Sequence, residues 1–282
     1  MLRRALSVLL TVVCIGAAIG QSHRLGPRKP QPTGIAYWDL DHFYDTIPSL
    51  FYNDEDHTPG GRLRWTAARY ARKVRHTAAV IDTMGLPIVA LWGVENREVA
   101  RDIAAACEGG YTFLHRTLNT LDGMDFALLY YGDVFFPSYV ETGRRYLYVE
   151  GAFRHPDGET LGLLLCSDAR IVRWALDDLR DERPGVRLVV AGRIGSTDPA
   201  VYGLHDATAR AADTGRGNIR RRGGWTMRDR ILADTALHAR GGDVFARRFL
   251  LDPMRGTPLP TYDRRSYRGG YGYALPVFTY IE

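Results

Sequence analysis

The chain has few cysteines and almost no lysine. Its 282 residues include three cysteines, which excludes a miniprotein held together by disulfides. With 14 prolines and 30 glycines, it is neither collagen-like nor of low complexity. The proportions of hydrophobic residues (45%) and charged residues (24%) are those of a globular protein with a sizeable core. The composition therefore excludes disorder and fibrous repeats, but it indicates no particular chemistry.

Lysine occurs only as Lys29 and Lys73, so the positive charge of the chain is almost wholly guanidinium. Guanidinium groups are suited to bidentate contacts with phosphate and carboxylate. The arginines that crowd the C-terminal third are Arg216, Arg220, Arg221, Arg222, Arg228, Arg230, Arg247, Arg248, Arg255, Arg264, Arg265 and Arg268. Several aspartates stand near them in the sequence, so an anion-binding face and internal ion pairs are both open interpretations.

The N-terminus has the pattern of an export signal. Arg3 and Arg4 precede an uncharged run over 5–20 that ends in small residues. We expect residues 1–20 to be a signal peptide and residues 21–33 to be a polar, proline-rich tether. Removing the two arginines lowers the formal charge from +5 to +3. The mature protein is then expected in the periplasm or outside the cell without a transmembrane span, and an uncleaved membrane anchor is the alternative.

Export would place Cys107 and Cys166 where disulfides form. Cys107 follows an alanine-rich helical pattern, and Cys166 ends a leucine-rich strand pattern. Two free thiols and one disulfide both remain open.

From Gly34 onwards, strand-like and helix-like patterns alternate. Strands are expected over 35–40, 88–92, 125–131, 146–153, 161–167 and 187–191, and helices over 63–84, 97–107 and 168–180. The helix over 63–84 places Val74, Ala78 and Ile81 on an apolar face and its basic residues, Lys73 among them, on a solvated face. No internal repeat or linker divides the chain, so we expect one α/β domain over 34–282.

Five blocks of the sequence resemble, in order and spacing, the endonuclease/exonuclease/phosphatase superfamily in the secreted form common in Bacteroidetes-like genomes. The longest block runs over 54–99 and ends in ALWGVENREV, and the others are DGMDFALLY (122–130), VVAGRIGSTDP (189–199), WTMRDRIL (225–232) and GGYGYALPVF (269–278). The resemblance implies an α/β fold, a four-layered α/β sandwich of two packed mixed sheets flanked by helices. It also implies a cleft at one end of the sheets.

In active members of that superfamily the cleft holds one or two divalent ions, usually magnesium, and cleaves phosphoester bonds. This chemistry needs oxygen ligands for the ion and a carboxylate base for the attacking water. The resemblance places Asp39 where the family has an asparagine. Gly93 stands in place of the metal-binding glutamate, Arg193 in place of the catalytic aspartate, and Gly195 in place of the asparagine after it.

The histidine positions differ as well. Cys166 replaces a histidine, and Tyr273 and Ala274 replace a terminal aspartate and histidine, whereas Arg170 remains. Only Asp39 keeps a group that binds a metal ion. We therefore expect a pseudoenzyme that keeps the fold, has lost hydrolysis and needs no cofactor.

Such a protein would act as a scaffold or bind an anionic ligand or a protein partner, with weak binding of nucleic acid as a related property. The candidate ligand-binding residues are Asp39, Glu95, Asp125, Arg170, Arg193 and Tyr273. In a plainer interpretation, Arg193 and Tyr273 merely fill a vestigial cleft, and His42 is structural.

The alternative function is a divalent-metal-dependent phosphodiesterase or nuclease, with magnesium held by relocated carboxylates. The carboxylates available for this are Asp39, Asp41, Glu95, Asp125 and Asp168. Three of them also have plainer interpretations, because Asp168 can cap the helix that follows it, Asp125 can support its strand and loop, and Asp41 can simply be solvated.

Overall fold

The structure is a computed structural model, which describes residues 32–155, 157–195, 197–221 and 224–282. The expected signal peptide over 1–20, the tether as far as residue 31, and Arg222 lie outside the described residues. Residues 32–282 form one unit. Thr33, which we expected in the tether, already pairs with Ile281 in a sheet.

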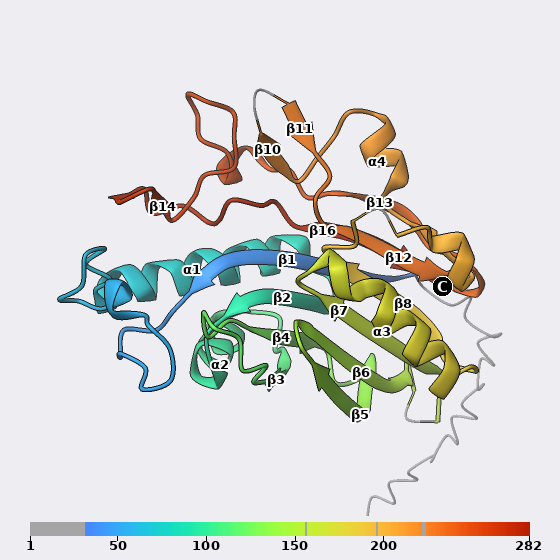
Figure 1. The fold of residues 1–282 in the computed structure, drawn as a ribbon. Coiled ribbons are helices and arrows are strands. Elements are labelled where there is room, and N and C mark those ends of the chain that lie inside the picture. Colours follow the sequence, from blue (N-terminus) through green and yellow to red (C-terminus); the bar gives the residue numbers. More distant parts are fainter. Residues whose placement is uncertain (1–31, 156, 196, 222–223) are drawn as a thin grey trace, which may run out of the picture. The chain divides into compact units, whose positions relative to one another are not determined.

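Two six-stranded mixed sheets form the body of the fold (Figure 1). The first sheet contains, in spatial order, β13 (Arg240–Val244), β16 (Val277–Ile281), β1 (Thr33–Phe43), β2 (Ile88–Val94), β4 (Asp125–Tyr130) and β3 (Thr112–Arg116). The second contains β5 (Phe135–Gly143), β6 (Tyr146–Phe153), β7 (Thr160–Cys166), β8 (Arg187–Gly192), β12 (Arg230–Asp234) and β9 (Leu204–Asp206). The β1–β2 and β7–β8 pairs are parallel, and the other pairs within these sheets are antiparallel.

Three longer helices flank the sheets (Figure 1). Helices α1 (Ala67–Met84) and α2 (Arg97–Ala106) share a buried cluster with the first sheet, and α3 (Ala169–Glu182) shares one with the second. The shorter elements are α4 (Ala209–Asp213), the hairpins β10 (Ile219–Arg221) with β11 (Gly224–Thr226) and β14 (Tyr262–Asp263) with β15 (Ser266–Tyr267), and the 3-10 turns Glu55–His57, Pro199–Tyr202, Thr235–Leu237 and Arg248–Leu250. Among the described residues, no helix is long and apolar enough to cross a membrane.

The side-chain alternation of β7 explains the layers. Leu161, Leu163 and Leu165 belong to the cluster between the two sheets, whereas Leu164 and Cys166 belong to the cluster beneath α3. Successive side chains of a strand point to opposite faces, so a strand covered on both faces is apolar throughout. The continuous apolar run of β7 is thus what a helix–sheet–sheet–helix sandwich requires, and the predicted four-layered fold is confirmed.

Local capping residues set where two helices begin. Thr66 has an extended backbone, and its hydroxyl accepts a hydrogen bond from the Arg69 N–H, so α1 begins at Ala67 rather than at the expected residue 63. Asp168 accepts a hydrogen bond from the Arg170 N–H at the start of α3, which confirms its expected role as a cap.

Lys73 corrects the interpretation of the basic residues on α1. Val74, Ala78 and Ile81 are buried as expected, but the Lys73 side chain is buried too, with only 3% of its surface exposed. Its ammonium group donates to the carbonyl groups of Leu40 and His42, at 3.2 and 3.0 Å. Lys73 therefore ties α1 to the end of β1 and is not part of a solvated face.

Cys107 and Cys166 are both free thiols. Cys166 is buried beneath α3, and Cys107 is half-buried at the end of α2. Of the two open alternatives, the structure therefore has two thiols and no bridge between these cysteines.

The sequence patterns missed the strands at the sheet edges and also two strands inside the sheets, β12 and β16. β3 and β5 each lie at one edge, and most of their residues are only partly buried. β5 also contains Pro137 beside an irregularity in its pairing with β6. A partly exposed edge strand lacks the apolar alternation from which strands were predicted.

Candidate functional site

The candidate site begins at Asp39, near the end of β1. The Asp39 side chain is 4% exposed, and its Oδ1 accepts a hydrogen bond from the Asp41 N–H at 2.8 Å. Just after Asp39 the register between β1 and β2 shifts, and Asp41 takes a left-handed backbone conformation with φ +63°. This local turn holds one oxygen of the Asp39 carboxylate and leaves the other facing the second sheet.

Two guanidinium groups from the second sheet meet that other oxygen. Arg193, directly after β8, places Nη2 3.1 Å from Asp39 Oδ2, and Arg228, two residues before β12, places Nη2 2.6 Å from it. Arg228 also pairs with Asp229, through Nη2 at 2.7 Å and Nε at 2.9 Å. The Asn218 amide donates to Asp229 at 2.6 Å. Two carboxylates and two guanidinium groups thus form a charge-balanced cluster between the sheets, which we call the Asp39 cluster.

Burial dominates the electrostatics of the Asp39 cluster. It raises the pKa of the Asp39 carboxyl, while the guanidinium groups of Arg228 and then Arg193 lower it. Tyr37 is buried next to the cluster, and burial together with the charges of Asp229 and Asp39 raises its pKa well above the usual value. Its hydroxyl has no hydrogen-bond partner. Arg228, despite burial, has a raised pKa because two carboxylates surround it, so it stays a cation.

Gly93 lies where the resemblance places a metal-binding glutamate. Its φ of +85° favours glycine, and a Cβ atom built on it would lie 1.8 Å from the Asp41 carbonyl oxygen. The pairing of β2 with β4 is also irregular between Trp92 and Val94. In this structure the backbone at Asp41 therefore occupies the space that any side chain at position 93 would need.

The family positions at the end of β7 and directly after β8 contribute backbone contacts. The Cys166 carbonyl accepts a hydrogen bond from the Arg193 N–H at 2.9 Å, and the buried thiol faces α3. The Gly195 carbonyl accepts a hydrogen bond from Arg230 Nη1 at 2.7 Å. These two contacts hold the segment after β8, and so they help to position Arg193.

The terminal motif packs against the end of β1. The Ala274 carbonyl accepts a hydrogen bond from the indole N–H of Trp38 at 2.9 Å. Tyr273 points elsewhere, because its hydroxyl donates to the Tyr262 carbonyl at 2.5 Å. Of these two sequence-derived site residues, Ala274 supports β1, and Tyr273 makes its hydrogen bond away from the Asp39 cluster.

The sequence-derived ligand candidates lie at different places in the structure. Arg193 joins Asp39, whereas Glu95 and Asp125 line a separate pocket. Arg170 pairs with Asp168 on the exposed start of α3, beside Arg144 and Arg145. Asp125 has the expected supporting role, because its Oδ1 accepts a hydrogen bond from the Leu118 N–H at 2.8 Å.

The side chains present do not fit a divalent ion at Asp39. Its carboxylate oxygens already contact two guanidinium groups and a backbone N–H, and position 93 supplies no second carboxylate. The acidic residues named as relocated ligands, Asp39, Asp41, Glu95, Asp125 and Asp168, do not gather at one point. Within the described ranges, no group of three or more His, Cys, Asp or Glu side chains is placed to hold a metal ion.

The sequence patterns indicated no site role for Arg228, Asn218 or Lys73. Arg228 directly precedes the aspartate of the WTMRDRIL block, a position from which a role beside Asp229 could have been inferred. Lys73 is the one lysine in an arginine-rich helix. Its compact ammonium group suits contacts with two backbone carbonyls better than the planar guanidinium group of an arginine would. No sequence signal marked Asn218.

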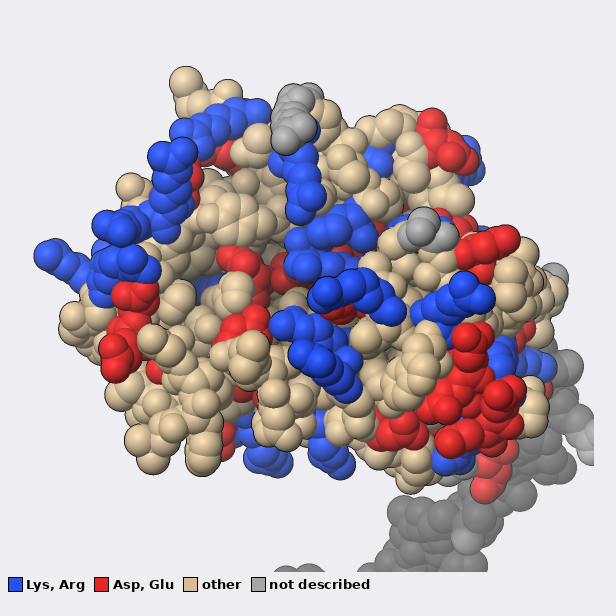
Figure 2. Space-filling view, viewed as in Figure 1, with Lys and Arg blue, Asp and Glu red and all other residues tan. Residues whose placement is uncertain are grey.

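Ion pairs account for many of the C-terminal arginines. Arg216 pairs with Asp243, Arg230 with Asp206, Arg255 with Asp263, and Arg268 with Asp252. Basic side chains nevertheless gather over the middle of the face shown in Figure 2, and acidic ones gather over the C-terminal half of α3. Internal pairing and a basic face are therefore both present.

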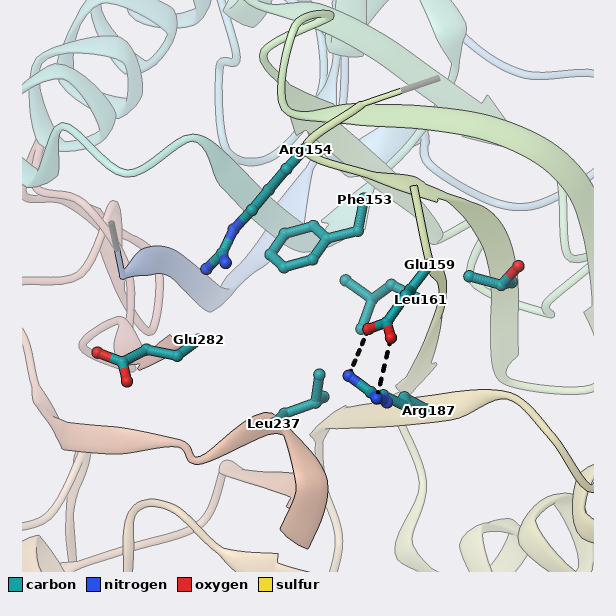
Figure 3. A pocket seen from close by; sticks show the side chains of 8 residues that line it. Phe153, Arg154, Glu159, Leu161, Arg187, Leu237 and Glu282 are labelled. Atoms are coloured by element: carbon teal, nitrogen blue, oxygen red, sulfur yellow. Dashed lines mark hydrogen bonds and ion pairs between the residues drawn. The ribbon is translucent and has the colours of Figure 1, made fainter. Parts of the chain in front are cut away.

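A small pocket of about 120 Å³ lies at the other end of β1 (Figure 3). Arg154, from its wall, donates to Thr33 Oγ1 and to the Ile281 carbonyl, at 3.1 and 2.9 Å. Arg187 and Glu159 form an ion pair across it (Figure 3). The pocket shares no residue with the Asp39 cluster, so it is no part of the candidate site.

Two packed mixed sheets with outer helices form the α/β sandwich that the resemblance to the endonuclease/exonuclease/phosphatase superfamily implies. Comparisons with known proteins agree. Residues 34–158 match a family model described as "Endonuclease/Exonuclease/phosphatase family". The chain thus has the fold found in this superfamily and, over 34–158, matches its sequence pattern, which confirms the resemblance in fold and for that segment.

Solved structures with this fold are similar over most of the chain. Truncated TDP2 from Caenorhabditis elegans is 13% identical, with 89% of this chain and 97% of that chain covered and a TM-score of 0.58. An endonuclease/exonuclease/phosphatase family protein from Bacteroides thetaiotaomicron is 12% identical, with coverage of 89% and 98% and a TM-score of 0.56. The mannosyl-6-phosphatase Bt3783 of the same species is 13% identical, with coverage of 89% and 99% and a TM-score of 0.54. No curated protein matches the sequence.

Proposed function

We propose that the chain is an exported pseudoenzyme of this fold, which no longer hydrolyses phosphoesters and binds an anionic ligand or partner beside Arg193. The observation that carries the proposal is the pair of guanidinium groups on Asp39. They put fixed positive charge at the carboxylate that would otherwise face a metal ion. A guanidinium stays protonated, so Arg193 supplies no general base for an attacking water.

The backbone at Gly93 supports the loss of hydrolysis. A metal site would need a carboxylate there, and the Asp41 carbonyl oxygen lies where its Cβ would be. Restoring the site would therefore require rebuilding the β1–β2 turn as well as changing one residue. For this reason the phosphatase activity in the name of the Bacteroides relative is not proposed for this chain.

Arg193 supports the binding role. Its side chain remains 42% exposed although one nitrogen contacts Asp39, and its buried Nε has no hydrogen-bond partner. A phosphate or carboxylate at the exposed edge of this guanidinium would gain charge-assisted hydrogen bonds without a metal ion. The proposed ligand therefore carries a phosphoryl or carboxylate group.

Hydrolysis is tested with the purified chain from residue 21 and the chromogenic diester bis(p-nitrophenyl) phosphate, in magnesium, manganese, calcium or zinc. We expect no turnover above that of the Asp39→Ala variant with any of these ions. Metal-dependent turnover that the Asp39→Ala variant lacks would overturn the pseudoenzyme proposal.

Binding is tested separately by calorimetry with pyrophosphate at low ionic strength. Arg193→Met should weaken binding about tenfold, since a charge-assisted bidentate contact is lost. Arg62→Met is the matched control, because Arg62 is an exposed arginine already paired with Asp56. Equal affinity of the wild-type protein and the Arg193→Met variant would contradict the binding role.

A further inference from the structure

A second pocket, of about 470 Å³, lies apart from the Asp39 cluster and shares no residue with it. The segment after β1 and the segment between β3 and β4 form its walls, together with the start of α2. Its lining residues are Phe51, Tyr52, Glu95, Asn96, Thr117, Asn119, Thr120, Leu121, Gly123 and Asp125. We call it the Glu95 pocket.

Two apolar side chains stand exposed in the lining of the Glu95 pocket. Phe51 is 92% exposed and Leu121 is 91% exposed, and they come from different segments. Tyr52 packs so closely against Gly123 that a Cβ there would lie 2.3 Å from the Tyr52 ring. Single exposed apolar residues are ordinary, but two that line one concave site provide apolar surface for a ligand to cover.

The polar wall of the Glu95 pocket includes the carboxylates of Glu95 and Asp125, which accept hydrogen bonds from neutral donors. Glu95 accepts hydrogen bonds from the Tyr52 hydroxyl at 2.9 Å and from the Asp45 N–H at 2.5 Å. Asp125 is likewise buried, and its Oδ2 lies 3.1 Å from His115 Nε2. No lysine or arginine lines the pocket, although the chain contains 37 of them.

We propose that the Glu95 pocket binds a primary ammonium group carried on an apolar stem. The ammonium complements the carboxylates of Glu95 and Asp125, and the stem covers Phe51 and Leu121. The same chemistry is found in free aryl or alkyl amines and in a lysine side chain of an apolar peptide. This site is independent of the proposed anion binding at Arg193, so either can fail without the other.

The surroundings of Glu95 give the binding a pH dependence. Burial, and then the negative charges of Asp45 and Asp54, raise the pKa of Glu95 to about 7, although the Asp45 N–H and the Tyr52 hydroxyl lower it. The other titratable groups near it are Tyr44 in the same segment and, across the pocket, Asp125 with its partner His115. A bound ammonium favours the carboxylate form, so amine affinity should rise between pH 6 and pH 8.

The test is calorimetry or ligand-observed NMR on the full mature chain with phenethylamine, and with 2-phenylethanol as the neutral match. The amine should bind at least about tenfold more tightly than the alcohol, because only the amine pairs with a buried carboxylate. Phe51→Ala should weaken amine binding about fivefold through lost apolar contact. Leu50→Ala is the matched control, because the Leu50 side chain, next to Phe51 in the sequence, is 95% exposed and does not line the pocket.

A second arm uses the blocked tripeptide acetyl-Phe-Lys-Phe-amide to distinguish the sources. Tighter binding of the peptide than of the free amine would assign the site to a protein partner, and the reverse order to a small amine. Both orders support the ammonium site. Absence of amine and peptide binding, equal binding of amine and alcohol, or equal effects of Phe51→Ala and Leu50→Ala would each overturn it.

Discussion

At the scale of single residues, Arg228 contacts both buried carboxylates of the Asp39 cluster. Arg228→Ala would leave Asp39 and Asp229 with less compensating charge, and removing one partner of a buried ion pair typically costs about 3 kcal/mol or more. We expect the free energy of unfolding in urea at pH 7 to fall by about that amount. Arg170→Ala, which breaks an exposed pair, should cost less than about 1 kcal/mol. Similar losses in the free energy of unfolding for Arg228→Ala and Arg170→Ala would contradict the burial of the Asp39 cluster.

Gly93 offers a second test at the residue scale. Gly93→Ala puts a Cβ against the Asp41 carbonyl at a φ of +85°, so both steric overlap and backbone strain oppose it. We expect a loss of about 3 kcal/mol in the free energy of unfolding. Gly110→Ala is the control, because Gly110 has a φ of +67° with no atom within 4 Å of the added Cβ. It should lose about 1 kcal/mol through strain alone. A Gly93→Ala variant as stable as Gly110→Ala would refute the close approach.

Among elements, the end of β1 is joined to the segment before β4 through His42. Its Nδ1 lies 3.1 Å from Asp41 and its Nε2 lies 3.7 Å from Asp122. The interactions with Asp122 and then Asp41 raise the pKa of His42 to about 9. A raised folded-state pKa adds stability that is fully present below about pH 6.5 and is lost as the pH rises through 9.

At that junction, the His42→Gln variant should be less stable than the wild-type protein at pH 6. The difference between their free energies of unfolding should shrink towards pH 9.5. The difference should stay under about 1 kcal/mol because the imidazole is half-exposed. Urea denaturation of both proteins at the two pH values measures it. A difference that does not change with pH would show that the imidazole makes no charge contact across this junction.

At the scale of the whole molecule, one apolar cluster runs between the two sheets, and a second lies under α3. Cys166 is fully buried in the second cluster, and burial raises the pKa of its thiol far above the usual value. We therefore expect a thiol reagent to reach Cys166 only through global unfolding. In the chain from residue 21 with Cys107 replaced by serine, the free energy of opening measured by labelling should equal the free energy of unfolding in urea. A lower opening free energy would mean that α3 separates from its sheet by itself.

Much of the fold could be predicted from sequence because its signals are local. The expected strand over 146–153 coincides with β6, and Asp168 caps α3 as expected. Edge strands were missed, since partial exposure weakens the alternation of apolar residues. The helix α1 was predicted to begin at residue 63 instead of Ala67, since one hydroxyl at Thr66 decides where it begins. Asp39 and Arg193 were both named as site residues, but their contact could not be predicted.

The sequence by itself determined the alternation of apolar residues, the helix caps and the motif blocks, because these depend on neighbours a few residues apart. Only the tertiary structure decided what Asp39 faces. Its partners Arg193 and Arg228 are 154 and 189 residues away along the chain, and the packing of one sheet on the other brings them together. Likewise, whether Lys73 faces water or two backbone carbonyls depended on where α1 crosses the end of β1.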